Sequence, residues 1–186
     1  MTTRKQAGDG PAAKPPSDSY TETKTVMELQ HLNIANTVHG GEIFRLVDNA
    51  GALAAFIHSD GPVVTAAIDT MSFLKPVHLG DLVTVTAVVN ATYHTSMEVG
   101  LTVSAYTPRT RETRTVATAY LVFVAVDDAD PQEPSPRPVP PLLVRSGDER
   151  QRQRDAAIRR ASRLRLRAAL QRAAGGRRAT GGRAGD

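Results

Sequence analysis

One long helical pattern, from Gly40 to His58, lies among segments that read as strands, and this arrangement limits the possible folds. Its apolar residues recur at the i, i+3, i+4 and i+7 spacing of a helix face, namely Ile43, Leu46, Val47, Ala50, Leu53, Ala54 and Ile57. Ala and Gly fill many other positions, so a neighbouring backbone can approach closely, although Gly51 within a helix costs roughly 1 kcal/mol relative to Ala. The pattern predicts a single helix over 40–58.

The segments around this helix are rich in Val and Thr, which is typical of strands. The run 23–30 precedes the helix, and the runs 63–74, 82–94, 96–107 and 113–126 follow it. Short polar breaks between the later runs predict antiparallel hairpins. One helix among five strands predicts an α+β domain, in which a curved antiparallel β-sheet wraps around one long central helix and buries it deeply.

Composition separates this domain from its flanks. Residues 1–22 are rich in Pro, Gly, Ala, Ser and Thr without periodicity, which predicts a disordered N-terminal tail before a folded domain over 23–128. Six of the twelve prolines lie between Pro131 and Pro141, so 129–143 is expected to be extended. Residues 144–186 form an Arg- and Ala-rich basic tail, expected to be a marginal helix or disordered.

Several classes of protein are excluded by composition. The chain has no Cys, so disulfides, thiolate metal ligands and a cysteine nucleophile are ruled out. No uncharged apolar run approaches the ~18 residues of a membrane span, so we expect a soluble, cytoplasmic protein. Aromatic residues make up 4% of the chain and Trp is absent, so aromatic platforms for stacking nucleic-acid bases are not expected.

Charge is distributed unevenly. Residues 1–143 hold 10 Lys or Arg and 15 Asp or Glu, a net charge of −5, whereas residues 144–186 hold 13 Arg and 4 acidic residues, a net charge of +9. The basic tail lacks aromatics and any DNA-binding pattern, so a solubilising appendage is the favoured interpretation and nucleic acid is not an expected partner. A contact with nucleic acid, an anionic membrane or a ligand phosphate stays open.

Asp48 lies in the middle of the apolar helix, where a carboxylate needs a partner or access to water. It can be a surface residue, a buried structural anchor or a catalytic carboxylate beside a cleft. Its neighbours on the helix, Gly41, Ala52 and Ala55, are small and allow a ligand to approach. The catalytic interpretation is therefore favoured.

The start of the same helix, VHGGE, offers a second chemical feature, because unpaired N–H groups near Gly40 and Gly41 can polarise a carbonyl. The alternative is that the glycines serve a tight turn. Asp48 follows Gly40 by eight residues, or roughly 12 Å of helix, whereas a general base must lie within about 3 Å of its water. A site built from two chains, paired with antiparallel helices in a C2 dimer, would bring both parts together.

The run NIANTVHGGEIFRLVDNAGALAA, with VVTAAIDTMSFLKPVHLGD and HTSMEV after it, resembles the hotdog-fold acyl-CoA thioesterases of the cytosolic acyl-CoA hydrolase type over residues 24 to 127. The resemblance implies a hotdog fold, homodimers that share a continuous sheet, and trimers of such dimers. It also implies EC 3.1.2 chemistry, in which water cleaves fatty acyl-CoA to a fatty acid and CoA without a metal or another cofactor.

The resemblance also implies roles for residues. Asp48 matches the carboxylate that activates water, Asn33 matches the asparagine that positions water or thioester, and the N–H groups of Gly40 and Gly41 polarise the carbonyl. Asn36 is a less favoured alternative to Asn33. The expected CoA contacts are Thr65, Ala66, Ala67, His94, Thr95 and Ser96, although Ala67 and His94 stand where relatives commonly have serine.

Two other functions remain as alternatives. A non-catalytic hotdog module could bind acyl-CoA as a sensor or regulator and use its basic tail to contact a partner. An enoyl-CoA hydratase of the same fold needs a paired Asp and His, for which the chain offers His39 without a convincing matched carboxylate. Retention of both Asp48 and Asn33 favours the thioesterase.

Overall fold

The computed structural model describes residues 10–131 and 133–179, and its elements follow the predicted order. The main elements are β1 (Thr21–Val26), α1 (Gly40–Ser59), β2 (Val63–Phe73), β3 (Leu82–Thr92), β4 (Ser96–Thr107), β5 (Glu112–Ala125) and α2 (Gly147–Ala179), with short 3-10 turns at Pro16–Ser19 and Leu29–His31. The helix predicted over 40–58 is confirmed within one residue, and the four strands predicted after it are confirmed within two residues at each end.

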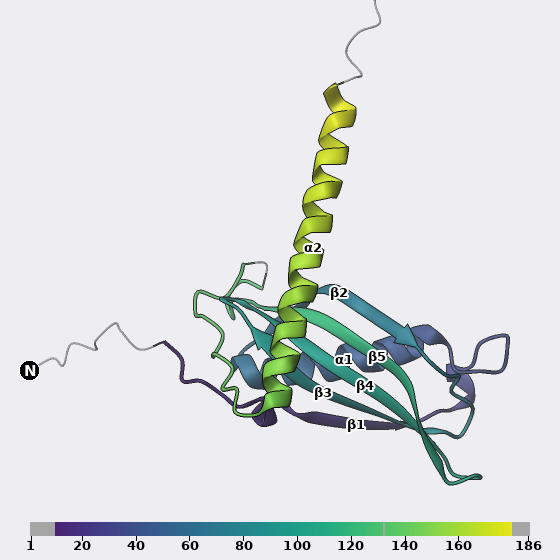
Figure 1. Cartoon of the computed structure of the whole chain (residues 1–186). Helices are drawn as coiled ribbons and strands as arrows, with labels where there is room; N and C mark the ends of the chain where they lie inside the picture. The colour runs from purple at the N-terminus through teal and green to yellow at the C-terminus, as the bar shows by residue number, and fades with distance from the viewer. Residues whose placement is uncertain (1–9, 132, 180–186) are drawn as a thin grey trace, which may run out of the picture.

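All five strands form one antiparallel sheet in the order β1-β3-β4-β5-β2, and this sheet curves around α1 (Figure 1). The predicted α+β fold is therefore confirmed. β2 is an edge strand, paired with β5 on one side. Two irregularities interrupt that pairing, one between Thr65 and Ala67 and one between Ile68 and Thr70. Such bulges bend an edge strand and redirect its side chains.

The core lies between α1 and the concave face of the sheet. Alternate residues of β3 and β4, such as Val85 and Val99, are fully buried against the buried face of α1, which includes Val47 and Ala54. A Cβ atom on Gly51 would lie 2.9 Å from two ring carbons of Phe123, a buried residue of β5. Glycine therefore occurs inside this helix because the sheet packs directly against its backbone.

The helix is not buried on all sides, as the sequence led us to expect. Leu53, Phe56 and Ile57 of α1 are 45%, 51% and 38% exposed. Edge strand β2 likewise leaves Val64 and Ile68 exposed, at 42% and 50%. The hydrophobic periodicity identified the helix correctly, but it did not separate residues that face the sheet from residues that face outward.

The N-terminal segment is ordered earlier than composition predicted. Ser19 and Thr21 are buried, and the Ser19 hydroxyl accepts a hydrogen bond of 3.0 Å from the Val89 N–H. Lys14 forms an ion pair of 2.7 Å with Asp60 at the end of α1. The prediction of disorder was thus wrong for residues 10–22, because polar contacts rather than an apolar pattern hold them, while residues 1–9 lie outside the described range.

The C-terminal part continues as an extended segment and then as α2. Val139 and Pro140 of the proline-rich segment are buried, so this segment packs on the domain. Of the two alternatives for the basic tail, residues 147–179 form a helix, which crosses the convex face of the sheet opposite α1 (Figure 1). Residues 180–186 lie outside the described range.

Candidate active site

A histidine caps the N-terminus of α1. The Nδ1 atom of His39 accepts a hydrogen bond of 2.9 Å from the Gly41 N–H, and the His39 carbonyl accepts the N–H groups of Glu42 and Ile43 at 2.9 and 3.4 Å. Within the described residues, the N–H of Gly40 is the donor of the first turn that has no such partner. Of the two predicted donors, the structure therefore leaves Gly40 open to a ligand oxygen and engages Gly41.

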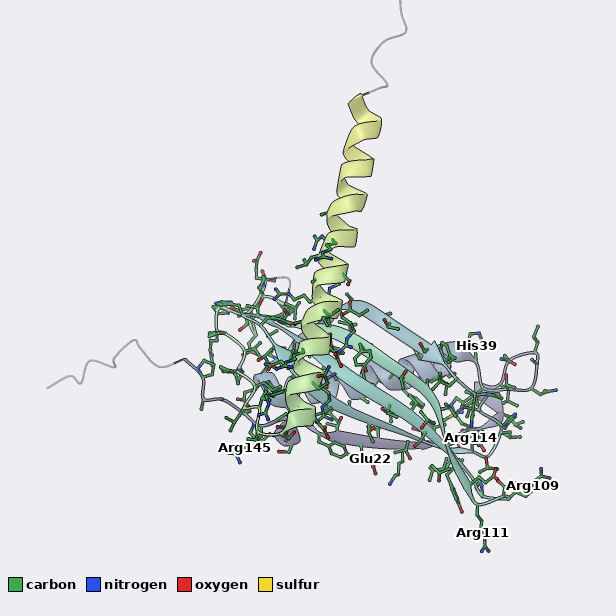
Figure 2. The ribbon with its side chains drawn as sticks, in the orientation of Figure 1. Glu22, His39, Arg109, Arg111, Arg114 and Arg145 are labelled. Atoms are coloured by element: carbon green, nitrogen blue, oxygen red, sulfur yellow. The ribbon has the colours of Figure 1, made fainter. Side chains whose placement is uncertain are left out.

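A hollow of about 360 Å³ opens beside Gly40. It is lined mainly by apolar residues, with one lysine: Val38, Gly40, Ile43, Phe73, Leu74, Lys75, Pro76, Val77 and Val116. The ring of Phe73 lies 3.5 Å from the position of a Cβ atom on Gly40, so a side chain there would fill the space above the free N–H. His39 and Arg114 lie at this end of the sheet, and Arg145 lies at the other end (Figure 2).

Asp48 lies two turns further along α1 and is half-buried. Its Oδ1 accepts a hydrogen bond of 2.7 Å from the hydroxyl of Thr65, an exposed residue of β2. Its Oδ2 has no hydrogen bond within the part of the chain that the structure describes. Asp48 is thus not a buried structural anchor, and an oriented carboxylate with one open oxygen can accept a proton from water.

Asn33 organises the loop before α1. Its Oδ1 accepts the N–H groups of Ala35 and Thr37 at 2.8 and 3.3 Å, and its Nδ2 donates to the Thr37 hydroxyl at 3.0 Å. Asn36 occupies the left-handed region with φ of +57°, which asparagine tolerates and which a turn requires here. The Asn33 side chain holds its own loop, and in a single chain it is not hydrogen-bonded to Asp48.

The residues expected to contact CoA fall into two groups. Thr65, Ala66 and Ala67 lie on β2, where Thr65 faces α1 and bonds Asp48. His94, Thr95 and Ser96 form the turn before β4, and their backbone is engaged: the His94 and Thr95 carbonyls accept the N–H groups of Val139 and Ala125 at 2.8 Å. Strand alternation places Ser96 on the convex face with Glu98, so one chain does not bring the two groups together.

The flank beside Asp48 is open and apolar. Edge strand β2 has backbone groups free to pair, and Ile68 and Phe73 on it are 50% and 57% exposed. Phe56 of α1 is 51% exposed, and Ile34 in the Asn33 loop is fully exposed. An exposed edge strand next to large apolar side chains is typical of a surface that another chain covers.

Sequence analysis missed a buried clasp beneath the hollow. The Asp81 carboxylate accepts hydrogen bonds from Arg114 and Thr107, both at 2.6 Å, and from the His78 N–H at 2.9 Å. Burial raises the pKa of Asp81, but these three hydrogen bonds outweigh it, and the pKa lies below its usual value. Arg114 also donates to the carbonyl of Pro76, which lines the hollow. The sequence indicated only a turn aspartate here.

Comparisons with known proteins agree with this fold and site. Residues 35–112 match the family model described as the thioesterase superfamily. An uncharacterised acyl-CoA thioester hydrolase of Bacillus subtilis is 35% identical over 108 residues, which are 58% of this chain and 63% of that protein. A hexameric acyl-CoA thioesterase of known structure is 30% identical, with a TM-score of 0.78 over 86% of this chain and 99% of that chain.

A third relative is an acyl-CoA hydrolase from Staphylococcus aureus, solved in complex with butyryl-CoA, CoA and CoA disulfide. It is 28% identical, with a TM-score of 0.77 over 88% of this chain and 97% of that chain. Its structures include variants in which an asparagine, an aspartate and a threonine are each replaced by alanine.

A single helix wrapped by an antiparallel sheet, with a carboxylate on its flank and a free N–H at its start, defines the hotdog-fold class of thioesterases. The chain belongs to the thioesterase superfamily, and its relatives are acyl-CoA thioesterases and hydrolases. Among the described residues, neither helix combines the length and the apolar character needed to cross a membrane.

Proposed function

We propose that the protein hydrolyses fatty acyl-CoA to a free fatty acid and CoA at a site shared by two chains. The observation that carries this proposal is the separation of the two reactive parts along α1. Asp48 and the free N–H of Gly40 lie eight residues apart, roughly 12 Å of helix axis. Two copies joined through β2 with antiparallel helices would bring Asp48 of one chain toward Gly40 of the other.

In this reaction Asp48 takes a proton from water as the water oxygen attacks the thioester carbonyl carbon. The Gly40 N–H stabilises the developing oxyanion, which contributes on the order of 10² to 10³ in rate. The C–S bond then breaks, the acid leaves, and the CoA thiolate takes up a proton. No metal or other cofactor is required, because a thiolate leaves readily from an activated acyl group.

The assignment of residues draws support from the Staphylococcus aureus hydrolase. The three positions replaced by alanine there are an asparagine, an aspartate 15 residues later and a threonine 17 residues after that. Asn33, Asp48 and Thr65 have the same spacing in this chain. We therefore assign Asn33, rather than Asn36, to hold the loop that positions water or thioester, and Thr65 to orient Asp48.

The substrate class is proposed from the hollow beside Gly40. Its apolar lining suits an acyl chain, and Lys75 at its rim suits a phosphate of CoA. The turn of His94, Thr95 and Ser96, with Ala66 and Ala67 of β2, would contact CoA in the assembled protein. Hexameric relatives support a trimer of dimers, and we propose a cytoplasmic location, where acyl-CoA is available.

Mixed dimers test the shared site. Asp48→Ala and Asn33→Ala variants should each release little free thiol from acyl-CoA, with an expected loss of about 100-fold for Asp48→Ala. When the two variants are unfolded together and refolded in equal amounts, half of the dimers combine one chain of each kind. Each mixed dimer regains one intact site of two, so about a quarter of native activity should return.

No recovery in mixed dimers would contradict the shared site, provided that size measurements show that mixed dimers formed. A panel of substrates from acetyl-CoA to palmitoyl-CoA, assayed with the native protein, then gives the preferred chain length. If the native protein binds these thioesters and releases no thiol from any of them, the enzyme proposal fails and the sensor alternative takes its place.

A further inference from the structure

The N-terminal half of α2 is fixed to the convex face of the sheet. Arg159 binds the buried carboxylate of Glu98 on β4 through two nitrogens, at 2.5 and 3.2 Å, and its guanidinium lies 3.7 Å from the ring centre of Tyr120. Burial lowers the pKa of Arg159, but the bonds to Glu98 outweigh it and the pKa is raised, so the pair is fully ionised. Ala156, one turn earlier, is completely buried.

Successive arginines show the direction in which α2 crosses the sheet. Arg152 lines a hollow with Thr86 of β3, Arg159 binds Glu98 of β4, and Arg163 forms an ion pair with Asp69 of β2. The helix therefore runs across the strands toward edge strand β2. It continues beyond this edge, as the yellow end in Figure 1 shows.

The part of α2 beyond Arg163, residues 164–179, is here called the arm. Sixteen residues of helix span roughly 24 Å, about five strand spacings. Within the described part of the chain, none of the arm's side chains forms a hydrogen bond or ion pair with the domain. The arm contains five Arg and no acidic residue. A helix of this length is marginal in water by itself, so a surface must support it.

The edge that the arm passes is the edge through which two copies pair in the proposed function, and the inference rests on that pairing. In a continuous antiparallel sheet the two-fold axis is perpendicular to the sheet, so both α2 helices lie on the same convex face and run in opposite directions. Each arm must then extend over the other chain, whose residues 1–143 carry a net charge of −5.

One flank of α2 suits such a neighbour. Ala157, Ala161 and Leu164 are exposed and Ala168 is half-exposed, at the i, i+4, i+7 and i+11 spacing of one stripe beside the face that contacts the sheet. Small side chains let two helices approach closely, and Leu164 lies next to Arg163, where α2 passes β2.

We infer that the α2 helices of two copies pair antiparallel across the β2 seam, so that each arm clamps the convex face of the other chain. This clamp lies on the face opposite α1 and the proposed active site. Its occupant is a second copy of this chain, joined through β2.

Cysteine cross-linking tests the pairing without interference, because the native chain has no cysteine. Leu164→Cys lies near the seam and should give a covalent dimer with a short bis-maleimide. Ala157→Cys is the matched control, because it lies on the same stripe but roughly 10 Å further from the seam. Two copies of the control residue should be about 20 Å further apart, so it should give at least ~10-fold less covalent dimer.

Adding Ile68→Cys, an exposed residue of β2, identifies the chains that are joined. If both cross-links join the same two chains, the double variant gives covalent dimers and no larger species. Larger covalent species would mean that the helices join chains of different dimers, and this result would overturn the inference.

The remaining outcomes separate the inference from the proposed function. If sedimentation shows dimers or hexamers but Leu164→Cys does not cross-link, the clamp is absent and the shared active site is unaffected. If the native protein is a monomer, the proposed function itself fails. Binding of a short DNA duplex that is lost when the chain ends at Arg163, without cross-linking at Leu164→Cys, would assign the arm to nucleic acid and overturn the clamp.

Discussion

At the scale of single residues, the hydrogen bond from Thr65 to Asp48 is the contact most directly tied to the reaction. We predict that Thr65→Val lowers kcat for thiol release about three- to tenfold, because a single hydrogen bond contributes about 0.5 to 1.5 kcal/mol. The KM should change less, since the bond orients the base rather than the substrate. Steady-state kinetics with the preferred acyl-CoA measures both constants.

Two further variants make this prediction specific. Thr65→Ser keeps the hydroxyl and should retain most of the native kcat. Thr102→Val removes a hydroxyl from an exposed position on the convex face, remote from Asp48, and should leave kcat unchanged. An unchanged kcat in Thr65→Val would show that Asp48 needs no orienting partner.

Gly51 gives a second prediction at this scale, which concerns stability. Alanine is a better helix former by about 1 kcal/mol, but its Cβ atom would lie 2.9 Å from the ring of Phe123, and overpacking costs about 1 to 3 kcal/mol. We expect Gly51→Ala to lower the Tm. Gly61→Ala is the control, because a Cβ atom there meets nothing within 4 Å. A raised Tm in Gly51→Ala would mean that Phe123 moves aside without cost.

At the scale of elements, a histidine joins the end of α1 to the proline-rich segment. His58 is completely buried, and its Nε2 lies 2.9 Å from the carbonyl of Pro140, to which it donates. Burial lowers the pKa of His58; the bond to Pro140 opposes this effect and nearby Lys14 adds to it, and the pKa ends below its usual value. The folded protein therefore holds this histidine in its neutral form.

The consequence is a pH-dependent stability. The unfolded chain binds a proton at His58 below about pH 6.5, whereas the folded chain binds it at lower pH, so the free energy of unfolding falls as pH drops below 6.5. His58→Gln keeps an N–H donor for Pro140 and cannot be protonated. Urea unfolding at pH 7.5 and pH 5.5 should show a smaller loss of stability in His58→Gln than in the native protein. Equal losses would exclude His58 as the cause.

The same scale shows what sequence patterns can and cannot predict. Apolar periodicity located α1, and Val- and Thr-rich runs located the strands, because burial of one face imposes those periods. The docking of α2 was not predictable in this way. It depends on Arg159 and Arg163, four residues apart on the helix, meeting carboxylates from two strands far away in the sequence.

The candidate site was predictable to a similar degree. An aspartate within an apolar helix and a glycine pair at its start stand out locally, so Asp48 and Gly40 were identified from the chain alone. The capping of Gly41 by His39 and the bond from Thr65 were not identified, because both depend on side-chain directions in the folded protein. The catalytic and CoA-binding roles of these residues stay predictions.

At the scale of the whole molecule, the open β2 edge and the shared site lead to one prediction. A charge in the β2 seam should prevent pairing, because an ammonium group there would be buried without a partner. We expect Ile68→Lys, at a position 50% exposed in the single chain, to remain folded and to sediment as a monomer, whereas the native protein forms dimers or hexamers. Circular dichroism and sedimentation velocity measure these two properties.

The activity of that monomer decides how far catalysis depends on assembly. Leu79→Lys provides the comparison, because Leu79 is equally exposed but lies in the turn before β3, and this variant should keep both its assembly and its activity. If each site needs Asp48 from one chain and Gly40 from the other, the Ile68→Lys monomer should lose at least ~100-fold in thiol release, as much as Asp48→Ala loses. A folded monomer with native activity would instead require that a single α1 supplies both groups, which its length opposes.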